Sequence, residues 1–153
     1  MADIVFNIAK GRVAELQNRV QSNDPAASTI VVVPVDAGVT TDATIKDFAT
    51  LAAVLAGGVT ERAATGWNRK ALTDAVVTAA TTDQAGDRVL ADLPDQTWTA
   101  VSAGAVTDLL ICYSPSAGAD STIVPMVMLD FAITPDGSDV VWQLNASGYY
   151  QAT

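Results

Sequence analysis

The chain has 153 residues, half of them apolar, which suits one domain with its own hydrophobic core. Eight lysines and arginines against seventeen aspartates and glutamates give a formal net charge of -9. A surface this acidic repels phosphate backbones and anionic lipid headgroups, so nucleic acid and membranes are poor candidate partners.

The sequence also lacks the signals of export and membrane insertion. It contains no run of roughly eighteen or more apolar residues, so we expect no membrane span. Its start, Met1-Ala2-Asp3, lacks the basic region and apolar stretch of a secretory signal. We therefore expect a protein made in the cytoplasm.

The N-terminal third mixes strand and helix signals. Between Asp3 and Ala9, Ile4, Phe6 and Ile8 alternate with less apolar neighbours, which predicts a strand. Residues 13–21 fit a helix or a strand, and the missing capping residue before them favours a strand slightly. Residues 29–35 are strongly β-branched, and the continuous run 30–33 should lie in the middle of the core or under a partner.

One helix is predicted at about residues 42–56, where apolar residues recur at three- and four-residue spacing before Gly57-Gly58. Residues 78–86 are polar and alanine-rich, and we expect an exposed loop. Strands are predicted at 88–93, 96–101, 108–114, 123–133 and 140–150, and the turn at 134–138 predicts a hairpin between the last two.

These elements predict a mainly β (α+β) fold over residues 1–153. We expect a single compact antiparallel sandwich- or barrel-like domain with one substantial helix. Residues 1–12 are predicted to form a docking arm or an edge strand. Cys112, flanked by Ile111 and Tyr113, is expected to be a buried strand residue that behaves as a small hydrophobe.

Catalytic and metal-binding patterns fail for lack of partners. The sequence contains no histidine and so lacks the commonest general base and metal ligand. Ser116, in the loop Ser-Pro-Ser-Ala-Gly, therefore has no histidine to activate it as a nucleophile. Asp136 and Asp139 flank a glycine but lack the further spaced oxygens of a calcium loop. We assign no catalytic residue, cofactor or metal, and expect that the protein is not an enzyme.

Two groups of residues are candidates for contact with a partner. The first is the N-terminal segment, whose apolar side chains could add a strand to a neighbouring sheet next to two cations; its members are Ile4, Phe6, Ile8, Lys10 and Arg12. The second is a set of aromatic side chains that could be exposed and stack on a sugar; these are Trp67, Trp142, Tyr149 and Tyr150.

Four stretches of the sequence, Ile4–Val13, Asn18–Pro25, Asp92–Thr99 and Asp130–Asp139, resemble a family of short proteins encoded by tailed bacteriophages, notably those of actinobacteria. The likeness runs in order from near residue 4 to the C-terminus and is weakest between Thr60 and Gly86. Members of this family are described loosely as virion structural proteins, and the resemblance carries no catalytic residues.

The resemblance implies a virion component assembled in the host cytoplasm. The favoured expectation is a capsid decoration protein that binds the outer surface of the head, with the major capsid protein or other virion proteins as partners. Such a protein would form a homo-oligomer, with a trimer favoured. The alternatives are a minor tail, baseplate or appendage protein, and a carbohydrate-binding module for the host surface.

Overall fold

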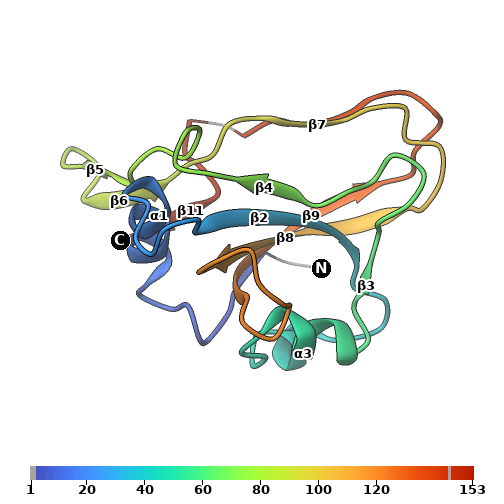
Figure 1. Cartoon of the computed structure of the whole chain (residues 1–153), viewed down its shortest axis with the longest axis horizontal. Coiled ribbons are helices and arrows are strands. Elements are labelled where there is room, and N and C mark those ends of the chain that lie inside the picture. Colours follow the sequence, from blue (N-terminus) through green and yellow to red (C-terminus); the bar gives the residue numbers. More distant parts are fainter. Residues whose placement is uncertain (1–2, 145) are drawn as a thin grey trace.

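A computed structural model of the chain describes residues 3–144 and 146–153. This part is mainly β, with antiparallel sheets and three short helices (Figure 1), as the sequence predicts. The helices are α1 (Val13–Gln21), α2 (Asp42–Ile45) and α3 (Leu51–Ala56). The strands are β1 (Ile4–Val5), β2 (Thr29–Asp36), β3 (Thr60–Glu61), β4 (Lys70–Leu72), β5 (Thr81–Asp83), β6 (Arg88–Ala91), β7 (Gln96–Trp98), β8 (Val106–Ser114), β9 (Val124–Ile133), β10 (Val140–Trp142) and β11 (Tyr150–Ala152).

The largest sheet has the strand order β1-β9-β8-β2-β3, and β4 also pairs with β2. Its centre is the antiparallel set β2, β8 and β9, the longest strands of the fold. Two smaller sheets complete the β structure: the ribbon β10-β7 and the three-stranded sheet β11-β6-β5. The three sheets together use all the strands listed above.

Both faces of the central strands are buried within the chain. Along β2, Ile30 and Val32 belong to one hydrophobic cluster, whereas Val31, Val33 and Val35 belong to another. Successive strand residues point to opposite faces, so the continuous apolar run at 30–33 supplies both clusters at once. The prediction that this run lies in the middle of the core is therefore confirmed.

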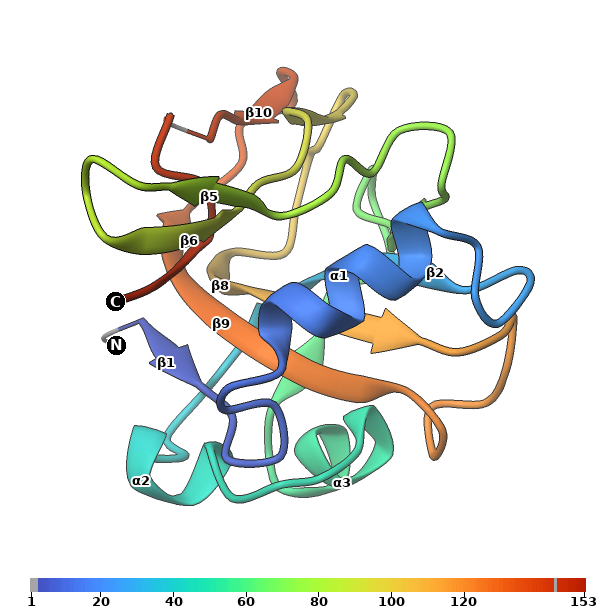
Figure 2. The same ribbon diagram turned by 90° about the vertical axis from the view of Figure 1, so that its left-hand side faces the viewer.

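Different elements cover the two faces. On one face, α1 packs together with the two small sheets, whose Trp98 and Val140 join the cluster around Ile30. On the other, α2 and α3 contribute Ile45, Leu51 and Val54. Figure 2 shows this layering, with α2 and α3 on one side of β9 and the strands β5, β6 and β10 on the other.

The slight preference for a strand at residues 13–21 was wrong, because the segment forms helix α1. Val13, Leu16, Gln17 and Val20 are buried at helical spacing. No side chain caps the helix at Arg12. Instead, backbone turns precede it, with Ala9 and Lys10 donating to Phe6 and with Arg12 donating to Ala9. These backbone turns precede α1 in place of the side-chain cap that the sequence lacks.

The single helix predicted at about residues 42–56 is two short helices. Thr50 is extended and its Oγ1 accepts a hydrogen bond from the N–H of Ala53, so a new helix begins there. The carbonyl of Lys46 accepts instead from the N–H of Asn7. The apolar spacing was nevertheless informative, because Ile45, Phe48 and Leu51 all pack on the same cluster.

Several strand boundaries also differ from prediction. The strand expected at residues 3–9 is limited to β1, and the loop expected at 78–86 contains β5. The strand expected at 140–150 is β10 and β11, on either side of residue 145, which lies outside the described residues. The hairpin predicted at 134–138 is wrong, because β10 pairs with β7; Gly137 and Ser138 instead bond to the backbone of Val101.

Gly148 lies where the chain before β11 packs closely against the end of β6. Its φ is +68°, and a Cβ there would lie 2.1 Å from the carbonyl oxygen of Ala91, which accepts from the N–H of Tyr149. Gly11 has a similar φ of +75° with nothing within 4 Å of the same position. Gly148 therefore combines the conformational requirement with a close backbone approach.

We predict that Gly11→Ala lowers the free energy of unfolding by about 1 kcal/mol, the cost of a left-handed alanine. Gly148→Ala should cost about 3 kcal/mol or more, because the backbone at Ala91 must also move. Urea denaturation followed by tryptophan fluorescence measures both. Equal losses for the two variants would contradict the close packing of β11 on β6.

Candidate interaction surface

The N-terminal segment is part of the chain's own sheet. Ile4 and Val5 pair with Met128 and Val127 of β9, so the edge-strand form of the prediction describes the segment. Phe6 is 0% exposed in the cluster with Val33, which corrects its assignment as a docking residue. Ile8 is 39% exposed and Lys10 is exposed.

Arg12, the remaining N-terminal candidate, is exposed at the start of α1. Its Nε lies 3.1 Å from Oε2 of Glu15. Glu15 also meets Nε of Arg19 at 2.9 Å. These two hydrogen bonds lower the pKa of Glu15. Of the five predicted docking residues, Phe6 lies in the core and Arg12 pairs with Glu15 at the start of α1. The other three, Ile4, Ile8 and Lys10, lie at or near the sheet edge.

The predicted aromatic contact residues are mostly core residues. Trp67 is 3% exposed, Trp142 is 6% and Tyr149 is 5%, and only Tyr150 is partly exposed. Trp67 packs edge-on against Trp98 with a centroid distance of 5.3 Å, and its Nε1 donates to the carbonyl of Gly104 at 2.7 Å. Aromatic rings of this kind fill the cluster above the sheet, so they do not form an exposed sugar-stacking platform.

Cys112 is buried in β8, as predicted. Burial raises the pKa of its thiol, which keeps the thiol protonated and poorly nucleophilic. Among the described residues, no group of three or more carboxylate, cysteine or histidine side chains is arranged to hold a metal ion. A separate finding concerns membranes: none of the described helices has the length and apolar character to cross one.

The strongest ion pairs centre on Arg69, next to the start of β4. Its guanidinium donates to both carboxylate oxygens of Glu61 at 2.6 Å, and to the two oxygens of Asp120 at 2.6 and 2.9 Å. The hydrogen bonds that Arg69 donates to Asp120 and Glu61 raise the pKa of Arg69, and the hydrogen bonds to Asp120 lower the pKa of that carboxyl group. Because Asp120 lies between β8 and β9, this two-sided clamp ties that loop to β3 and β4.

Every arginine of the sequence has a carboxylate partner in the chain. In addition to the three above, Arg62 lies 2.6 Å from Asp36, and Arg88 lies 2.8 Å from Asp83. The remaining acidic charge is spread over exposed carboxylates that pair with no described cation; they include Asp74, Asp87, Asp92, Asp95, Asp136 and Asp139. Among the described residues, the exposed surface therefore carries more carboxylates without a cationic partner than guanidinium groups without an acidic one.

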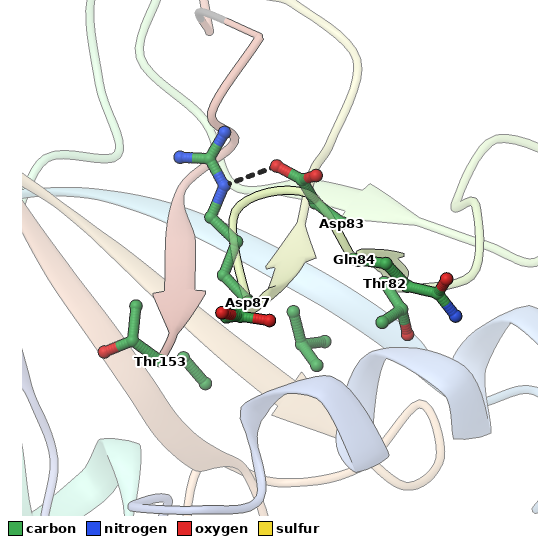
Figure 3. A pocket seen from close by; sticks show the side chains of 8 residues that line it. Thr82, Asp83, Gln84, Asp87 and Thr153 are labelled. Atoms are coloured by element: carbon green, nitrogen blue, oxygen red, sulfur yellow. Dashed lines mark hydrogen bonds and ion pairs between the residues drawn. The ribbon is translucent and has the colours of Figure 1, made fainter.

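A surface groove of about 660 Å³ lies on the small sheet β11-β6-β5. Register places Thr82, Val89 and Ala152 side by side across the three strands. Figure 3 shows Thr82, Asp87 and Thr153 on one side of this sheet, with the carboxylate of Asp83 on the other. The groove therefore has a small, largely apolar floor and polar side chains at its margin.

This groove was not predicted from the sequence, because the polar, alanine-rich residues 78–86 indicate an exposed loop. A usable signal was present. Thr81 and Thr82 are β-branched, and Gly86 lies in the short loop before the β-compatible residues Val89 and Leu90. Such an arrangement is typical of a hairpin. The contribution of β11 could not be predicted in this way, since it depends on pairing over sixty residues of sequence.

The central sheet also contains one buried carboxylate, Asp108 of β8, which is 1% exposed and lies opposite Asp130 of β9. Thr107 Oγ1 donates to its Oδ2 at 2.5 Å, whereas Oδ1 has no hydrogen-bond partner among the described residues. Burial raises the pKa of Asp108, and the charges of Asp130 and Asp42 add to this rise. Ionisation of the Asp108 carboxyl group therefore lowers the free energy of unfolding.

We predict that Asp108→Asn stabilises the protein at neutral pH relative to the wild type. As pH rises above the ordinary aspartate pKa of 3.8, the unfolded chain loses its proton more readily than the folded chain, so wild-type stability falls. The difference between the two proteins should disappear at pH 3. Urea denaturation at several pH values measures it. Asp74→Asn, at an exposed position, is the control and should show no such pH-dependent gain.

Comparison with known proteins adds no relative: no protein-family model, no curated protein and no solved structure matches this chain.

Proposed function

We propose that this chain is a non-enzymatic structural protein of a tailed-phage particle that binds the outer surface of the head as a decoration protein. The resemblance of Ile4–Val13, Asn18–Pro25, Asp92–Thr99 and Asp130–Asp139 to small phage proteins supports a place in the virion. The structural features below support docking on another protein as the activity.

The distribution of charge is the observation that carries the proposal. The arginines are held by the chain's own carboxylates, as in the Arg69 clamp, and a net charge of -9 remains. Charge complementarity then favours a partner surface rich in lysine and arginine. The same charge opposes binding to a phosphate backbone, so the proposed partner is a protein of the particle, such as the major capsid protein.

The packing of the sheet supports the same role. Side chains of the chain itself bury both faces of β2 and β8, so the body of the molecule is formed before any partner binds. A preformed body loses little conformational freedom on docking, and more of the contact energy remains for binding. A homo-oligomer, with a trimer favoured, is part of the proposal because decoration proteins commonly assemble at symmetry axes of the head.

Purified particles of the phage that encodes this chain test the proposal. After heads and tails are separated, quantitative mass spectrometry should find the chain on heads, at a copy number that follows the number of capsid subunits. Salt should release it from intact heads, because screening weakens attraction between charged surfaces. Recovery only with tails would show the alternative tail role, and absence from particles would contradict a virion function.

A further inference from the structure

We propose that the groove on β11-β6-β5 receives an extended, lysine- or arginine-bearing segment of the partner protein, which adds a strand along the free edge of β5. This inference rests on the docking function proposed above and names the part of the partner that is bound. It is carried by three observations on the small sheet: an open strand edge, a half-exposed apolar floor, and an exposed carboxylate, Asp87, at the margin.

The open edge is the outer side of β5. In the sheet order β11-β6-β5, this strand pairs with β6 alone among the described strands. Thr81 and Thr82 are exposed and carry no charge that would block an incoming strand. An edge of this kind offers backbone N–H and C=O groups to another chain, and main-chain hydrogen bonds then supply affinity.

The floor determines which side chains the incoming strand can place. Thr82, Val89 and Ala152 lie in one row, and Val89 and Ala152 are only partly exposed. A strand added next to β5 would place every second side chain beside Thr82, at the end of this row. The small size of the floor residues leaves room for aliphatic side chains such as valine, whose burial would add hydrophobic stabilisation.

The margin determines the charge of the segment. The carboxylate of Asp83 already pairs with Arg88, which also donates from Nη1 to Gln151 at 3.1 Å. Asp87 is exposed at the end of the hairpin loop and forms no salt bridge with a described cation, since the neighbouring Arg88 pairs with Asp83. Because Asp87 lies on the same side of the sheet as Thr82 (Figure 3), its charge is available to a lysine or arginine that points to the same face as the aliphatic side chains of the incoming strand.

The test uses the full chain labelled with ¹⁵N and a short blocked peptide in which threonine alternates with valine or lysine, so that the valines and lysines share one face of the strand. We expect saturable chemical-shift changes at Thr82, Val89 and Ala152. We also expect slower amide exchange in β5, because added strand hydrogen bonds protect its amides. A peptide with glutamate in place of lysine should not bind. Shift changes scattered over the acidic surface, without protection in β5, would overturn the inference.

Two matched variants separate the groove from general charge attraction. Asp87→Asn removes one charge at the margin and keeps a residue type that tolerates the observed φ of +48°. It should weaken peptide binding roughly fivefold. Asp74→Asn removes the same charge at an exposed position outside the groove lining and should leave the affinity within roughly twofold. Equal effects of the two substitutions would contradict a site at the groove.

This test and the particle experiment can fail independently. If the chain is abundant on heads but the peptide does not protect β5, the groove inference is wrong and the decoration function stands. If the peptide binds at β5 but the chain is absent from particles, the decoration function is wrong while the strand-accepting groove stands.

Discussion

Burial of the central sheet on both faces is the constraint on which the rest of the structure depends. β2 and β8 pair over most of their length, and alternate residues along each enter opposite hydrophobic clusters. Such a sheet must be covered twice, because either face left open would expose a row of aliphatic side chains. Helix α1 and the two small sheets cover one face, and α2 with α3 covers the other. This packing buries four side chains that the sequence suggests as contact residues, so they are not available to a partner. They are Phe6, Trp67, Trp142 and Tyr149.

The same constraint moves the interaction surface to the periphery. With both faces of the large sheet covered, the exposed features include carboxylates and the margins of the smaller sheets. The Arg69 clamp and the other arginine pairs strengthen this division, since they use cations to hold loops in place. The exposed surface is acidic and includes the groove on β11-β6-β5. Charge complementarity with a basic protein partner and strand addition at β5 are therefore two aspects of one proposed docking mode.

Local patterns were sufficient for the centre of the fold and insufficient for its covering layers. The strands β2, β8 and β9 follow from β-branched and apolar runs, and the burial of Cys112 follows from its neighbours in β8. The segment at 13–21 depended on tertiary burial of Val13, Leu16 and Val20, which outweighed the missing cap. The break in the predicted helix depended on Thr50, a capping residue placed inside an otherwise helical pattern. The groove required the distant pairing of β11 with β6, and no local pattern encodes such a pairing.

We propose that this acidic body, held together by internal ion pairs, acts by docking on a protein of the virion. A reconstruction of the intact particle at side-chain resolution tests it most directly. We expect density for the fold on the outer surface of the head, with the β5 edge and its groove against a basic segment of a capsid subunit. Density for the fold in the tail alone would contradict the decoration role, and a head-bound molecule whose β5 edge faces solvent would contradict docking through β5.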